Sequence, residues 1–120
     1  MKDVAIIKSW FIQKNGAISL SHNKEFIIEK ETEKAVLIKQ KNRESWMPKS
    51  AVEFLSKAEI EEYIEKIYSQ MQDKYSAKEI QKLAQKAIGK SSKVNKFFIG
   101  NISKEEEINY LSFQIIEKEL

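Results

Sequence analysis

The spacing of apolar positions changes once along the chain, close to residue 55. Before that point apolar residues alternate with polar ones or form short runs, as they do in β-strands. After it they recur every three or four residues, as on one face of an α-helix. The pattern therefore predicts an α+β fold in which an N-terminal antiparallel sheet is followed by three helices packed on it.

Five segments of the first part have the composition of strands, and turn residues separate them. The predicted strands cover residues 4–12, 17–21, 25–32, 35–40 and 44–47. The predicted turns are Asn15-Gly16, which favours a type I′ hairpin, His22-Asn23 and Lys41-Asn42-Arg43. Pro48 cannot donate a ladder hydrogen bond, so the fifth strand should end there or lie at an edge. Together the strands predict a five-strand antiparallel sheet or an SH3-like barrel.

Three capping boxes predict where the helices begin. In this motif a serine accepts a hydrogen bond from the backbone of a glutamate three residues later, and the glutamate side chain reaches back to the serine N–H. The boxes begin at Ser56, Ser76 and Ser103. Gly89 suits the position that follows the end of the second helix. The apolar stripe of that helix is predicted to consist of Ile80, Leu83, Ala84, Ala87 and Ile88.

The change of spacing also predicts the domain organisation. Residues 1–54 should form a small β-sheet module and residues 55–120 a three-helix region, and the short join between them favours one compact unit. A chain of 120 residues is long enough to bury a core without disulfides.

The composition gives little support to catalysis. The chain has no cysteine, which excludes disulfides, thiolate zinc sites and cysteine nucleophiles, and its single histidine, His22, lies in a predicted turn. The sequence contains no Gly-rich phosphate loop. We therefore expect a protein that is not an enzyme and uses no cofactor, metal or small-molecule substrate. The absence of cysteine, of a signal peptide and of a long apolar segment favours the cytoplasm over a membrane or the cell exterior.

Positive charge is concentrated in the second predicted helix. Residues 72–100 contain seven basic and two acidic residues, although the formal net charge of the whole chain is only +3. Lysines recur there every four residues, which on a helix gives a ridge that drifts by about 40° per step. The candidate contacts with an anionic partner are Lys74, Lys78, Lys82, Lys86, Lys90, Lys93, Asn95 and Lys96. A second basic patch consists of Lys39, Lys41, Arg43 and Lys49. The alternative is that these residues form an ordinary solvated surface.

Residues 76–98 also resemble a helix-turn-helix, with residues 89–98 as the turn and recognition helix. The side chains that would then face the major groove of DNA are Ser92, Lys93, Asn95 and Lys96. The separation between Ile80 and Val94 is about one helical turn too long for this motif, and Gln81 stands where a small residue is usual. A helical hairpin with a basic rim is the alternative interpretation.

Four aromatic residues of the predicted sheet have two possible roles. On an open sheet face they can stack nucleobases, whereas on a covered face they belong to the core. We expect core positions for Trp10, Phe11, Trp46 and Phe54.

One segment of the predicted sheet resembles a small module of uncharacterised phage and mobile-element proteins. The resemblance rests on Thr32-Glu33-Lys34-Ala35-Val36-Leu37-Ile38 followed by Trp46-Met47-Pro48-Lys49-Ser50, and it covers roughly residues 25–54. It implies a phage, prophage or plasmid setting in a bacterial cytosol, where small proteins are often accessory binders, including inhibitors of host defence such as anti-CRISPR proteins. We therefore expect a non-catalytic accessory or inhibitor protein that binds a host protein or nucleoprotein complex. The alternative is a direct nucleic-acid-binding protein that uses the lysine-rich second helix.

Overall fold

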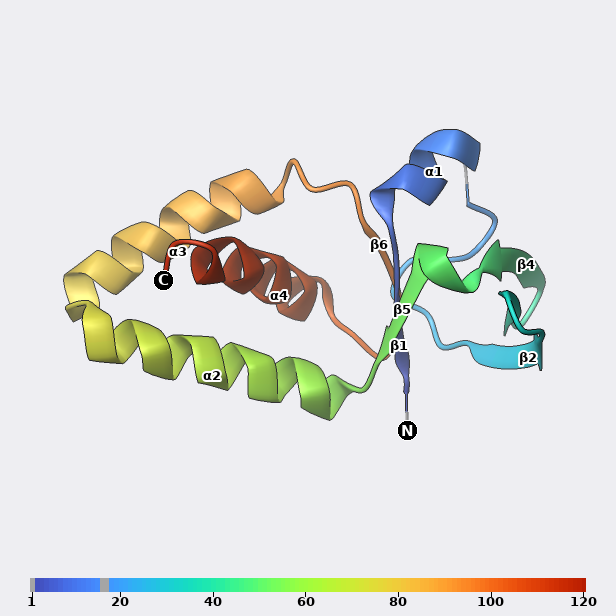
Figure 1. Cartoon of the computed structure of the whole chain (residues 1–120), viewed down its shortest axis with the longest axis horizontal. Coiled ribbons are helices and arrows are strands. Elements are labelled where there is room, and N and C mark those ends of the chain that lie inside the picture. Colours follow the sequence, from blue (N-terminus) through green and yellow to red (C-terminus); the bar gives the residue numbers. More distant parts are fainter. Residues whose placement is uncertain (1, 16–17) are drawn as a thin grey trace. The chain divides into compact units, whose positions relative to one another are not determined.

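The computed structural model of the chain describes residues 2–15 and 18–120. Within these ranges it has an α+β fold with four α-helices and two three-stranded sheets (Figure 1). The described residues form two compact units. The β unit comprises the chain up to Lys57 together with Asn95–Ile102, and the helical unit comprises Ala58–Val94 together with Ser103–Leu120.

The first sheet of the β unit is built around a buried central strand. Strand β1 (Val4–Ile7) pairs antiparallel with β5 (Val52–Leu55) on one side and with β6 (Phe97–Gly100) on the other. All four residues of β1 are buried. A strand that is covered on both faces is expected to be apolar throughout rather than alternating, as the Val-Ala-Ile-Ile sequence of β1 is.

The second sheet is a meander with β3 at its centre. Strands β2 (Ile27–Glu31), β3 (Ala35–Gln40) and β4 (Arg43–Pro48) pair antiparallel in that order. The predicted central strand at residues 35–40 and the tight turn after it are confirmed. Pro48 lies opposite Ala35 at the end of an edge strand, which agrees with its inability to donate to a ladder. A short 3-10 helix, η1 (Lys49–Ala51), leads from β4 to β5.

One hydrophobic core joins the two sheets of the β unit. Its buried members are Ala5, Ile7, Leu20, Val36, Ile38, Met47, Val52 and Ile99. Successive residues of a strand point to opposite faces of a sheet. The side chains of β3 and β4 that alternate with the core residues Val36, Ile38 and Met47 therefore lie on the other, outer face of the second sheet. That outer face includes Leu37, Lys39 and Trp46.

The prediction of a five-strand sheet or SH3-like barrel is wrong. Residues 9–15 form α1 (Ser9–Asn15) instead of continuing the first strand, and residues 18–21 form no strand. The described strands form no closed barrel, and the sequence pattern does not predict β5 or β6. The Trp-Phe-Ile run of α1 has high β propensity, but tertiary context overrides it because Phe11 and Ile12 pack against the core from a helix.

Two predicted turns near α1 have different outcomes. Of the predicted Asn15-Gly16 turn, Gly16 lies outside the described ranges, and Asn15 is the last residue of α1, so no strand precedes it as the type I′ hairpin would require. The His22-Asn23 turn is confirmed, with Asn23 at a φ of 54°, a left-handed conformation that asparagine tolerates well. The turn bonds to the edge of β6 that does not pair with β1, since the N–H of Asn23 donates to the carbonyl of Phe98 over 3.0 Å.

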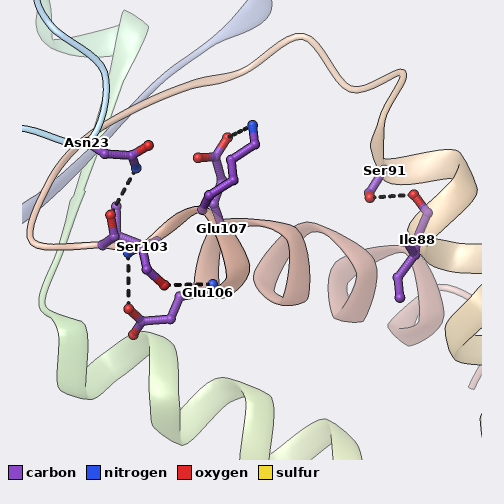
Figure 2. Close-up of polar contacts among 8 residues, drawn as sticks. Asn23, Ile88, Ser91, Ser103, Glu106 and Glu107 are labelled. Atoms are coloured by element: carbon purple, nitrogen blue, oxygen red, sulfur yellow. Dashed lines mark hydrogen bonds and ion pairs between the residues drawn. The ribbon is translucent and has the colours of Figure 1, made fainter.

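The helical unit consists of the three predicted helices. They are α2 (Lys57–Lys74), α3 (Ala77–Ser91) and α4 (Lys104–Glu117). The capping boxes at the starts of α3 and α4 are confirmed, and Figure 2 shows the reciprocal bonds between Ser103 and Glu106. The three helices share a core of Ile67, Met71, Ala87 and Ile116.

The end of α3 differs from the prediction. The helix continues through Gly89 to Ser91, whose hydroxyl donates to the carbonyl of Ile88 over 2.8 Å (Figure 2). Ile88, a predicted member of the buried stripe, is exposed. The predicted recognition helix is also absent, because residues 97–100 form strand β6. The helix-turn-helix interpretation is therefore wrong.

Asp3 fixes the chain at the start of β1. Its carboxylate accepts a hydrogen bond from the N–H of Lys57 at 2.9 Å and one from the side-chain amide of Asn101 at 3.2 Å. Lys57 is the first residue of α2, where a negative charge is favourable. Partial burial raises the pKa of the Asp3 carboxyl, but these hydrogen bonds lower it by more, so the pKa lies below its ordinary value.

We predict that Asp3→Asn destabilises the protein at neutral pH and that the difference from wild type disappears in acid. Because the folded-state pKa of Asp3 is depressed, its contribution to stability is complete above the unfolded-state pKa of about 4 and is lost as the pH falls through the folded-state value. Urea unfolding of both proteins at pH 7 and near pH 2 measures the two differences in free energy. A difference that is the same at both values of pH would contradict this role of the carboxylate.

Two glycines give a second, paired prediction. Gly100 has a φ of +104°, and a Cβ there would collide with the carbonyl oxygen of Asp3, whereas a Cβ on Gly89 of α3 would meet nothing within 4 Å. We expect Gly100→Ala to lower the free energy of unfolding by about 2 kcal/mol or more. Gly89→Ala should raise it by about 0.5–1 kcal/mol, because alanine restricts the unfolded chain and favours the helix. Thermal and urea unfolding measure both, and equal effects would contradict the backbone argument.

Candidate functional site

Helix α3 carries four of the predicted lysines along its solvent side. Lys78, Lys82, Lys86 and Lys90 are all exposed, and Lys74 stands exposed in the last turn of α2. We call these five residues the lysine ridge. At about 1.5 Å per residue, the part of the ridge on α3 extends over roughly 18 Å. The opposite side of α3 contains Ala87 and Ser91, which are buried, so the lysines and the core-facing residues occupy different sides of the helix.

The positive charge of α3 has little compensation nearby. α3 contains four lysines and one glutamate, a net charge of +3, whereas α2 has three basic and five acidic residues and α4 has one basic and four acidic residues. Lys90 forms an ion pair with Glu119 at 3.7 Å. Among the described residues, Lys78, Lys82 and Lys86 form no ion pair within 4.0 Å.

Glu79, the one acidic residue of α3, is already engaged in the cap. Its carboxylate accepts a hydrogen bond from the N–H of Ser76 at 3.0 Å. This bond and the Ser76 hydroxyl lower the pKa of Glu79, with a smaller contribution from the charge of Lys82. The carboxylate therefore stays ionised and attracts Lys82, but a single glutamate cannot offset the charge of the four lysines of α3. Like charges at this spacing each cost a few tenths of a kcal/mol, about 0.2–0.5 per pair.

A shallow hollow of about 250 Å³ lies beside the ridge, and we call it the α3 hollow. Its lining residues are Tyr75, Glu79, Lys82, Leu83 and Lys86. Tyr75 and Leu83 are partly buried against the core of the helical unit, whereas Lys82 and Lys86 are exposed. The hollow thus combines an apolar surface with two ridge lysines. The apolar and charged spacing of the sequence does not predict this hollow, although all of its lining residues lie within residues 75–86, in the join between α2 and α3 and the first turns of α3.

The remaining predicted contacts do not continue the ridge as one helical surface. Lys93 lies in the turn after α3, with its N–H donating to the carbonyl of Lys90 at 3.1 Å. Asn95 and Lys96 belong to the β unit and lead into β6. The recognition surface expected from residues 92–96 is therefore not formed by a helix.

The second basic patch lies on the β unit and is largely paired. Lys39 forms an ion pair with Glu29 at 3.6 Å, and Lys49 forms one with Glu31 at 2.9 Å. The guanidinium of Arg43 donates to the carbonyl of Ser19 at 3.1 Å. Lys41 and Arg43 also line a polar hollow of about 550 Å³ at the tip of the β3–β4 hairpin. Because most of its cations already have partners, this patch offers less free positive charge than the ridge.

The outer face of the second sheet is more apolar than the sequence analysis predicts. Trp46 is 50% exposed and lies opposite Leu37, and Ile27 is 61% exposed and lies opposite Lys39. Trp10 of α1 is 44% exposed. The expectation that both tryptophans belong to the core is therefore wrong, although Phe11 and Phe54 do pack against it. The exposure of Trp46 could have been predicted from the alternation of β4, because the neighbouring Met47 points into the core and adjacent residues of a strand face opposite sides.

The described part of the chain offers little support for a metal site or a membrane-spanning helix. No three His, Asp or Glu side chains there are grouped as metal ligands would be. The ring of His22 packs edge-on against Phe97, with 5.1 Å between ring centroids. No described helix is long and apolar enough to cross a membrane.

Comparison of the chain with protein-family models, with curated proteins and with solved structures gave no match. Among the described residues, the lysine ridge is the surface on which exposed lysines, most of them without ion pairs, lie beside a hollow with an apolar wall.

Proposed function

We propose that this is a non-catalytic binding protein whose lysine ridge holds the phosphate backbone of a nucleic acid. One observation carries the proposal: Lys78, Lys82 and Lys86 follow one another along an exposed helix side and form no ion pair within 4.0 Å among the described residues. Lysine contacts phosphate as a mobile point charge, and neutralising phosphates releases condensed counterions, which drives association.

The regular spacing of the ridge favours a polyanion over a single anionic group. Lysines one helical turn apart along roughly 18 Å present a repeating row of charge, which matches a repeating row of phosphates better than one carboxylate or one phosphate. Binding would also relieve the repulsion between neighbouring lysines. The acidic composition of α2 and α4 confines the favourable contact to α3.

We predict that a triple substitution of Lys78, Lys82 and Lys86 to Gln weakens nucleic-acid binding and flattens its salt dependence. Each lost phosphate contact should reduce the slope of log K against log salt concentration by about 0.9 for duplex DNA, so three contacts give a change of nearly 3. Fluorescence anisotropy with a labelled DNA at several salt concentrations measures the slope.

The matched control is a triple substitution of Lys39, Lys41 and Lys49 to Gln, which removes the same charge from the β unit. This control should retain most of the slope. If both triple variants lose affinity equally, net charge rather than the ridge controls binding. If the wild-type protein binds neither DNA nor RNA at low salt, the proposed function fails.

As a second candidate, we propose an accessory or inhibitor protein of a phage or mobile element that docks on a host protein or nucleoprotein complex in the bacterial cytoplasm. The outer face of the second sheet supports it, because exposed tryptophan and isoleucine side chains are typical centres of protein interfaces. Lys39 of that face is paired with Glu29 at 3.6 Å. The resemblance of residues 32–50 to a phage module gives the setting.

For this candidate we predict that Trp46→Ala removes inhibition whereas Trp10→Ala retains it. The two tryptophans have similar exposure, 50% and 44%, but only Trp46 lies on the outer sheet face. Truncating a central tryptophan of an interface commonly costs 2 kcal/mol or more, about a thirtyfold loss of affinity. Plasmid cleavage by purified bacterial defence nucleases, with and without the protein, provides the assay. Absence of both inhibition and complex formation across these nucleases would count against the candidate.

A further inference from the structure

The α3 hollow has the size of a subsite rather than of a complete ligand pocket. Its volume of about 250 Å³ is below the roughly 300–1,000 Å³ of sites that enclose a small molecule. A planar ring or one apolar side chain fits such a space, whereas a cofactor does not. The occupant should therefore be one part of a larger partner that makes its other contacts elsewhere on α3.

The lining of the hollow places an aromatic ring next to cations. Tyr75 is partly buried against the helical core, which holds its ring in place. The Nζ atom of Lys74 lies over one face of that ring, 5.6 Å from its centre, which leaves the other face as the surface for stacking. Lys82 and Lys86, one helical turn apart, line the same hollow. An aromatic side chain for stacking beside cations for the backbone is the combination with which proteins bind single-stranded nucleic acids.

Glu79, the one acidic residue that lines the hollow, disfavours a negatively charged group inside it. Glu79 is ionised and repels a phosphate, so phosphates are directed to the exposed lysines rather than to the apolar surface. An uncharged base can lie against Tyr75 and Leu83 without this repulsion. A base in a duplex is stacked between its neighbours and would have to flip out to reach the hollow, which costs unstacking energy.

We propose that the α3 hollow receives one unstacked base of a single-stranded nucleic acid, while the adjoining phosphates contact Lys82 and Lys86. This inference rests on the proposed function of the lysine ridge and goes further, because it specifies a single strand and assigns a stacking role to Tyr75. An apolar side chain of an acidic protein would compete for the same hollow, and the test below separates the two occupants.

The test compares Tyr75→Leu with a matched control, Tyr68→Leu. Leucine keeps apolar packing at position 75 but removes the ring, and Tyr68 is a 45% exposed tyrosine of α2 that does not line the hollow. Affinities are measured by fluorescence anisotropy for a labelled single-stranded DNA and for its duplex with the complementary strand. Tyr75→Leu should weaken single-strand binding by roughly five- to hundredfold and leave duplex binding within about twofold. Tyr68→Leu should leave both unchanged.

Photocrosslinking of the wild-type protein keeps the test decisive if Tyr75→Leu does not fold. Irradiation with a bromouracil-substituted single strand, followed by peptide mass spectrometry, should give an adduct on Tyr75. Adducts confined to Trp10 or Trp46 would overturn the inference.

The possible failures are distinguishable. If wild type binds single strand and duplex equally and Tyr75→Leu changes neither, the hollow holds no base, but the ridge remains a nucleic-acid surface. If wild type binds neither nucleic acid but binds an acidic, leucine-containing peptide in a Tyr75-dependent way, both the proposed function and this inference fail, and the hollow is a protein contact.

Discussion

The burial of β1 on both faces is the constraint on which the β unit depends. A strand without a solvent face must find partners on both edges, and β5 and β6 supply them. Both run antiparallel to β1 and therefore parallel to each other, so the chain between them must cross over rather than turn back tightly. Helices α2 and α3 lie within that connection. Asp3 and Gly100 secure the start of the central strand, one through hydrogen bonds to other segments and the other through a close backbone approach.

Charge is segregated among the three helices of the helical unit, and the proposed function rests on this segregation. Negative charge collects on α2 and α4, while α3 keeps lysines that the described part of the structure leaves mostly without ion pairs. An isolated helix with this pattern would be weakened by repulsion, but α3 is also held by its capping box and by the core that it shares with α2 and α4. Packing therefore stabilises a helix whose lysines stay exposed. The α3 hollow places an apolar surface beside two of these lysines.

Local signals predicted most of the helical unit and half of the β unit. The capping boxes at Ser76 and Ser103 involve only residues close together in the sequence. The starts of α3 and α4 could therefore be predicted from the sequence. The β3–β4 hairpin and Pro48 are local in the same sense. The lysine ridge followed from four-residue spacing on a helix. Pairings between distant segments could not be read this way: β6 lies inside the region of helical spacing, and its only strand partner within the described residues is β1.

The amino-acid sequence by itself determined the α+β class, the starts of α3 and α4 at their capping boxes and the row of lysines on α3, because each depends on residues within one or two turns of each other. Tertiary structure decided the rest. It made Trp-Phe-Ile a helix, because Phe11 and Ile12 could then reach the core. It turned Trp46 outward, because Val36, Ile38 and Met47 filled the inner face. Such outcomes depend on which distant surfaces become buried together, and local spacing does not contain that information.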